Sequence, residues 1–122
     1  AAITIAETGH LVFATLHTES GKDASERLEE LGISFRELKM VLKGVVSQRL
    51  IRKLCQKCGE TKGCINCDYT GYDGRFAVGD VLLWEREEGF KDFDDIENMK
   101  LQVFEKIKDG ETDIDEYKRK FI

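Results

Sequence analysis

Long apolar runs are missing from this 122-residue sequence, which also contains no proline and only two histidines. Its longest mostly apolar run, residues 11–16, is far shorter than the roughly 20 residues that span a bilayer, so no transmembrane helix is predicted. Low-complexity tracts and internal repeats are absent as well, which excludes a repeat architecture. The length suits one small domain, or a piece of a larger one.

The first residues carry no recognisable targeting signal. Residues 1–6 lack both the basic start and the long apolar centre of a secretory signal peptide, so none is expected. Because the chain starts with alanine instead of methionine, we expect it to be a fragment of a longer protein.

The charged residues are unevenly distributed, although the net charge is only −5. Residues 36–62 hold eight Lys and Arg against two Glu, whereas residues 73–122 hold nine basic and fifteen acidic residues. Oppositely charged stretches can attract each other, and most charge runs are solvated helix faces. The basic stretch is therefore weak evidence for nucleic acid, and we expect no nucleic-acid partner.

The first third of the chain has the pattern of an α/β protein. Residues 1–7 are predicted to be the end of a helix. Residues 11–16 are predicted to be a strand buried on both faces, because a short continuous run with Val, Phe and Thr is typical of a central strand. A helix is predicted over residues 24–31, closed by Gly32 in the left-handed conformation.

Further helices and a strand are predicted after residue 33. Ser34 and Glu37 fit a capping box, in which each side chain bonds a free amide at a helix start. The helix that follows is interrupted by Gly44, and its apolar face consists of Leu38, Val41, Leu42 and Val45. Residues 75–84 alternate like a strand, with an inner face of Phe76, Val78, Leu82 and Trp84. One more helix is capped by Asp94 or Asp95 and stopped by Gly110, and its apolar face consists of Ile96, Met99, Val103 and Ile107. A last helix covers residues 114–121.

All four cysteines lie within thirteen positions and form two C-x2-C turns, at Cys55, Cys58, Cys64 and Cys67. Two such turns brought together place four thiolates around a tetrahedral ion, with Zn–S distances of about 2.3 Å. Gly59 and Gly63 are expected to supply left-handed backbone that lets amides point at the sulfurs. The spacing predicts a structural Zn²⁺ site, because four protein ligands leave no position open for water.

Three other uses of the cysteines stay open. Two disulfides would require an oxidising compartment, which nothing in the sequence indicates. A redox-active C-x2-C usually opens a helix after a strand, unlike two adjacent copies flanked by glycines. Four thiolates can also hold iron.

The segment Ser20-Gly21-Lys22 resembles the end of a phosphate loop. The full pattern G-x4-G-K-[ST] would need glycine at Leu16 and serine or threonine at Asp23, so it fails. The start of a helix is the better interpretation.

The only two histidines, His10 and His17, flank the predicted strand over residues 11–16. Side chains seven positions apart point to opposite faces of a strand, so both reach one site only if they lie in the flanking turns. Turns at strand ends of α/β sheets commonly meet ligands. His10 and His17 are therefore candidates for a catalytic or sensing role, with plain structural histidines as the alternative.

Several motifs follow one another in an informative order. They are T-G-H-L-V at residues 8–12, T-L-H-T at 15–18, Q-R-L-I-R-K-L-C at 48–55 and T-G-Y-D-G-R at 70–75. In this order they resemble the histidine box, and the entry to and exit from the four-cysteine zinc element, of the motor ATPases of type II secretion and type IV pilus assembly. The resemblance covers residues 1–83, and more loosely residues 106–117.

This resemblance implies an α/β fold in three segments. Residues 1–54 would be the C-terminal part of a RecA-like ATPase core, residues 55–75 a small four-cysteine zinc module, and residues 76–122 a strand with C-terminal helices. In a fragment of this kind the strand over residues 11–16 would lose its neighbours, so we expect an exposed edge and self-association.

The resemblance also implies a function for the longer protein. Its family members are cytoplasmic homo-hexameric ATPases, peripheral at the inner membrane, that use ATP and Mg²⁺ to drive protein secretion or pilus assembly. The implied partners are an inner-membrane platform protein and a cytoplasmic recruiting protein. His10 and His17 would couple the nucleotide state to the arrangement of subunits.

The catalytic motifs of that family lie upstream of the histidine box, so this chain alone is expected to be inactive. The alternative function is a free-standing zinc-knuckle adaptor that binds protein or nucleic acid through residues 43–62.

Overall fold

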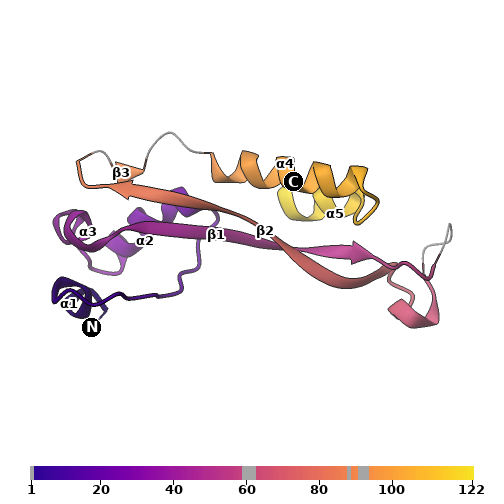
Figure 1. Ribbon diagram of the computed structural model, residues 1–122, viewed down its shortest axis with the longest axis horizontal. Coiled ribbons are helices and arrows are strands. Elements are labelled where there is room, and N and C mark those ends of the chain that lie inside the picture. Colours follow the sequence, from indigo (N-terminus) through magenta and orange to yellow (C-terminus); the bar gives the residue numbers. More distant parts are fainter. Residues whose placement is uncertain (1, 59–62, 88, 91–93) are drawn as a thin grey trace. The chain divides into compact units, whose positions relative to one another are not determined.

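The computed structural model describes residues 2–58, 63–87, 89–90 and 94–122 (Figure 1). Its elements are α1 (Ala2–Glu7), the 3-10 helix η1 (Gly21–Asp23), α2 (Ala24–Glu30), α3 (Phe35–Val41), β1 (Gly44–Leu54), the 3-10 helix η2 (Ile65–Cys67), β2 (Tyr72–Glu85), β3 (Gly89–Phe90), α4 (Asp95–Lys108) and α5 (Ile114–Phe121). The strands form one sheet in the order β1-β2-β3. None of the helices in these ranges has the length and apolar content that crossing a membrane requires.

The chain divides into two compact units. Unit 1 consists of Ala1–Ser47 and Val81–Asp95, and unit 2 of Gln48–Asp80 and Ile96–Ile122. The predicted segments 1–54, 55–75 and 76–122 stay a prediction, because they refer to the domains of a longer protein and not to packing within this chain.

The helices of unit 1 begin and end close to the predicted residues. Ser20 caps η1 by accepting a hydrogen bond from the Lys22 amide at 3.1 Å, so the segment after Glu19 is a helix start, as predicted. Gly32 follows α2 with a φ of +96°, and Ser34 and Glu37 form the capping box of α3. These predictions are confirmed. They could be made from the sequence because each depends on residues only a few positions apart.

Trp84 organises the apolar packing of unit 1 at the end of β2. It is 8% exposed, and its amide donates to the Lys43 carbonyl at 3.0 Å. The rings of Phe35 and Phe90 meet the indole edge-on, with centroid distances of 5.8 and 5.0 Å. Trp84 also pairs with Phe90 in the antiparallel β2–β3 ladder. The ring contacts of this side chain therefore join α3 to β3 within the unit.

A buried carboxylate fixes the start of η1. Asp95 is fully buried and accepts hydrogen bonds from the Gly21 amide at 2.8 Å and the Ser20 hydroxyl at 3.1 Å. A Cβ atom on Gly21 would lie 2.8 Å from Leu82 Cδ1 and 3.2 Å from Asp95 Oδ2, so only glycine fits without rearrangement. Burial alone would raise the pKa of Asp95, but these hydrogen bonds outweigh it and the pKa is lowered.

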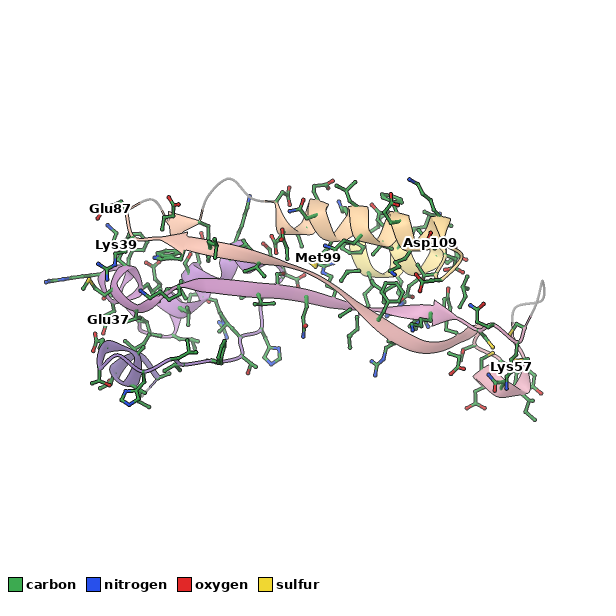
Figure 2. The ribbon with its side chains drawn as sticks, viewed as in Figure 1. Glu37, Lys39, Lys57, Glu87, Met99 and Asp109 are labelled. Carbon is green, nitrogen blue, oxygen red and sulfur yellow. The ribbon has the colours of Figure 1, made fainter. Side chains whose placement is uncertain are left out.

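The core of unit 2 lies between α4 and the strands. Ile51, Val78, Met99 and Val103 form a buried cluster, and Met99 is labelled in Figure 2. Around them pack Phe76, Ile96, Ile107, Tyr117 and Phe121. The predicted apolar faces of α4 and β2 are confirmed, and Gly110 ends the α4 region with a φ of +75°.

The strand β1 differs from the prediction. The predicted helix was to continue to Val45, but α3 ends at Val41, and Leu42 is extended with a φ of −67° and a ψ of +130°. Pairing with β2 makes the extended conformation favourable, since it satisfies the backbone of both strands. Gly44 lies so close to β2 that a Cβ atom there would be 2.9 Å from the Leu82 carbonyl oxygen.

The predicted strand over residues 11–16 is wrong for this structure. These residues form no helix or strand, and the side chains of Leu11 and Phe13 are 81% and 88% exposed. Among the described residues only β1, β2 and β3 form a sheet, so no strand pairs with this segment. An extended segment becomes a strand only when a neighbour satisfies its amide and carbonyl groups.

Candidate metal centre

The four cysteines lie in unit 2, between the end of β1 and the start of β2. Cys55 directly follows β1, and Cys67 is the last residue of η2, for which Cys64 is the N-cap. Figure 2 labels Lys57, which lies between Cys55 and Cys58, at this end of the strands. The structure therefore brings together both predicted C-x2-C turns.

The sulfur atoms are close enough to share one ion. All four lie within 4.8 Å of one another. Cys58 Sγ is 3.4 Å from Cys67 Sγ, and Cys64 Sγ is 3.8 Å from the Sγ atoms of both Cys55 and Cys67. A tetrahedral ion with Zn–S distances of about 2.3 Å keeps its sulfurs about 3.8 Å apart. The donor set thus fits a single tetrahedral ion.

The same distances bear on the alternatives for the cysteines. All four are free thiols, with separations well above the roughly 2.0 Å of a disulfide bond. An iron–sulfur cluster inserts sulfide and several irons among its thiolates. Sulfurs that all lie within 4.8 Å of one another leave space for one ion instead.

Amide groups point at the sulfurs, as metal-bound thiolates require. The backbone amides of Cys64 and Gly71 each donate to Cys67 Sγ at 3.3 Å. The Asn66 side-chain amide donates to Cys55 Sγ at 3.7 Å and to Asp73 Oδ2 at 3.3 Å. Asn66 was not predicted as a sulfur partner. Its place between Cys64 and Cys67 was the available signal, since groups around a metal site commonly orient its ligands.

The thiols differ strongly in acidity. The amides of Cys64 and Gly71 lower the pKa of Cys67 to about 6, and the Lys57 amide lowers the pKa of Cys55. Loss of solvent contact, with the neighbouring Cys64 and Cys67, raises the pKa of Cys58 to about 12. Crowded thiols cannot all ionise without a cation between them, so a metal ion that binds all four must displace at least the Cys58 proton.

The backbone of this turn follows an unusual path. Gly63 has a φ of +103°, and a Cβ atom there would approach the Tyr69 carbonyl oxygen to 3.0 Å, which confirms its predicted left-handed conformation. The matching prediction for Gly59 lies outside the described residues. Asp68 and Tyr69 are also left-handed, with φ values of 55° and 61°, although neither is glycine. Such strain persists only where surrounding contacts hold it.

The two candidate histidines lie elsewhere, in unit 1. His10 and His17 are both exposed, and His10 Nδ1 is 3.0 Å from the Thr8 hydroxyl. Both follow α1 within the irregular segment that replaces the predicted strand. Their role in nucleotide coupling stays a prediction.

Comparison with known proteins places this geometry in context. Residues 1–119 match the family described as type II/IV secretion system protein. The chain is 42% identical over 119 residues to the "Protein transport protein HofB homolog" of Haemophilus influenzae, covering 97% of this chain and 25% of that protein. It is 36% identical over 106 residues to the "Type IV pilus assembly ATPase PilB" of Thermus thermophilus, covering 66% of this chain and 12% of that protein.

A third relative is the "Type II secretion system protein E" of Klebsiella pneumoniae, 35% identical over 104 residues, with 67% of this chain and 21% of that protein covered. The described residues combine helices with a three-stranded sheet and hold a four-cysteine cluster. The chain belongs to the type II/IV secretion system protein family. It spans about a quarter or less of the length of these three relatives.

Proposed function

We propose that this chain is part of a motor ATPase that drives type II secretion or type IV pilus assembly. The observation that carries this proposal is the family match over residues 1–119, together with relatives named as a pilus assembly ATPase and a type II secretion protein. The function belongs to the longer protein, of which this chain supplies the histidine-bearing segment and the four-cysteine module. The family fold implies a RecA-like core around residues 1–54.

The 122 residues alone should not hydrolyse ATP. They contain no G-x4-G-K-[ST] pattern to hold the phosphates of ATP and Mg²⁺. In the longer protein, His10 and His17 would lie near the nucleotide and transmit its state to the arrangement of a homo-hexamer. Both side chains are exposed in this chain, so other segments of the longer protein or a neighbouring subunit have access to them.

The four cysteines would hold one structural Zn²⁺. Four sulfur ligands complete a tetrahedral shell, so the ion would have no open position for water or substrate. What the ion supplies is folding free energy for a turn with little apolar core of its own. The module would present a surface to the inner-membrane platform protein or to the cytoplasmic recruiting protein. In this proposal the motor works in the cytoplasm, peripheral at the inner membrane.

A chimera tests the motor function. The aligned segment of the Thermus thermophilus pilus assembly ATPase is exchanged for the corresponding residues of this chain, and ATP hydrolysis is measured. We expect turnover to be retained in the chimera and strongly reduced by His17→Ala. A folded hexameric chimera that hydrolyses ATP equally well with and without His17 would contradict the coupling role, and one with no turnover would contradict the proposal as a whole.

A native mass spectrum tests the metal function directly. The chain is prepared under reducing conditions without added metal, and its mass is compared with that of Cys67→Ser. We expect one zinc per chain in the unaltered protein, lost on chelation. A metal-free mass that becomes four hydrogens short when reductant is omitted would instead indicate two disulfides.

The alternative of a free-standing adaptor makes a different prediction. Salt-sensitive binding to an arbitrary DNA duplex through residues 43–62 would favour an adaptor that binds protein or nucleic acid. The family match over nearly the whole chain favours the motor.

A further inference from the structure

A carboxylate in the C-terminal helix of unit 2 is buried against the strand that leads into the cysteines. Glu116 in α5 is fully buried and accepts hydrogen bonds from Arg52 N at 2.9 Å and Arg52 Nε at 2.8 Å. Arg119 donates to the same carboxylate through Nε at 2.8 Å and Nη2 at 2.6 Å. Both oxygens are therefore satisfied, and two cations surround one buried anion.

Arg52, which Glu116 contacts, lies three residues before Cys55, the first of the four cysteines. The Arg52 carbonyl accepts a hydrogen bond from the Thr112 hydroxyl at 2.9 Å, and the Leu54 amide donates to the Glu111 carbonyl at 2.8 Å. The backbone from Arg52 to Leu54 is thus bonded to the residues that join α4 to α5 and to α5 itself. Cys55 follows, and its amide donates to Gly71 O at 2.9 Å.

The start of β2, where the chain leaves the cysteine turns, is held at the start of the same helix. The guanidinium of Arg52 lies over the Tyr72 ring, 4.1 Å from its centroid. The Tyr72 hydroxyl donates at 2.7 Å to Asp113 Oδ1, which also accepts the Glu116 amide at the start of α5. Tyr72 directly follows Gly71, whose amide bonds Cys67 Sγ. Both chain segments that enter and leave the cysteine turns therefore converge on the first turn of α5.

We propose that Glu116 is a positioning residue for the metal centre. By clamping Arg52 it holds the end of β1 and the start of β2 at the spacing that brings the four sulfurs together. This inference rests on the proposed metal-binding function of the cysteines. Four ligands on separate turns bind an ion tightly only when their relative positions are already restricted. Because linkage is reciprocal, metal binding also strengthens the docking of α5 by the same factor.

The test compares Zn²⁺ affinity across variants of the full 122-residue chain. Competition with a chromogenic chelator at neutral pH under reducing conditions gives the dissociation constant. Glu116→Gln keeps the size of the side chain but removes the charge that both arginines require, and we expect about 10–100-fold weaker binding. Glu105→Gln is the matched control, since Glu105 pairs with Lys108 at the surface. We expect its affinity to remain within about twofold of the unaltered chain.

Amide hydrogen exchange supplies the reciprocal measurement. Zn²⁺ should slow exchange in α5 of the unaltered chain and of Glu105→Gln, and should slow it far less in Glu116→Gln. A residue that merely stabilised the fold would change exchange throughout unit 2 without changing the response of α5 to Zn²⁺. That outcome would overturn the inference.

The remaining outcomes separate this inference from the function on which it rests. If the unaltered chain binds Zn²⁺ no better than Cys67→Ser, the metal function itself is wrong. If it binds tightly and Glu116→Gln binds equally well, only the clamp is wrong. Should Glu116→Gln fail to fold by far-UV circular dichroism, Tyr72→Phe replaces it, because it removes the hydrogen bond that ties the start of β2 to Asp113 at the start of α5. We then expect a several-fold loss of affinity, and an unchanged affinity would refute the clamp.

Discussion

Acid should remove a large contribution to the stability of unit 2 by protonating Glu116. Burial alone would raise the pKa of this group, but the hydrogen bonds from Arg119 and Arg52 outweigh burial and hold its pKa at about 2, against the ordinary value of 4.5. Each tenfold change in proton affinity is worth about 1.4 kcal/mol, so the difference corresponds to about 3 kcal/mol. A lowered folded-state pKa stabilises the fold above pH 4.5, and this stabilisation is lost as the pH falls towards 2.

The assay is urea unfolding followed by far-UV circular dichroism at several pH values between 6 and 2, with the unaltered chain and Glu116→Gln compared. A chelator is present throughout, because protonation of thiols would also release metal. Asp95 and Glu37, whose pKa values are also lowered, titrate in both proteins and cancel in the difference. The stability gap between the two proteins should shrink by about 3 kcal/mol between pH 6 and pH 2. A gap that does not change with pH would refute the assignment of the buried charge.

Three further predictions concern packing and the metal. Gly21→Ala should destabilise unit 1 by about 1–3 kcal/mol, because its Cβ would overlap Leu82, and an unchanged thermal midpoint would contradict this. Met99→Ala should lower the free energy of unfolding by about 2–5 kcal/mol in urea titrations, whereas Leu101→Ala, at an exposed position of the same helix, should change it by less than about 0.5 kcal/mol. Chelation should lower the thermal midpoint of the unaltered chain, measured by circular dichroism, but not that of Cys67→Ser.

The features that the sequence predicts correctly are those that depend on residues close together in the chain. The capping box of Ser34 and Glu37 and the left-handed Gly32 are determined within one turn of helix, so their chemistry is visible in the sequence. The same holds for the four cysteines, since a spacer of five residues between two C-x2-C turns keeps the turns close together in space. The coarse family assignment followed from motif order and agrees with the match over residues 1–119.

Features that depend on distant segments were not predictable in this way. Residues 11–16 have the composition of a buried strand, but composition does not say whether a pairing strand is present. Helical spacing continued through Val45, whereas pairing with β2 turned that residue into part of β1. Glu116 resembled one more solvated charge of an acidic tail. Its burial depends on Arg52, 64 positions away in the sequence.

The bonds between β1 and the residues before and within α5 have a consequence for solubility. Arg52 and Leu54 direct amide groups outward from the outer strand of the sheet, and these groups are covered by the Glu116 side chain and the Glu111 carbonyl. Uncovered groups of this kind form a template on which another chain can add a strand. The C-terminal helix therefore also shields the sheet from aggregation. A chain shortened before Glu111 would leave the Arg52 and Leu54 amides at the edge of β1 open to pairing with another chain, beside the cysteines.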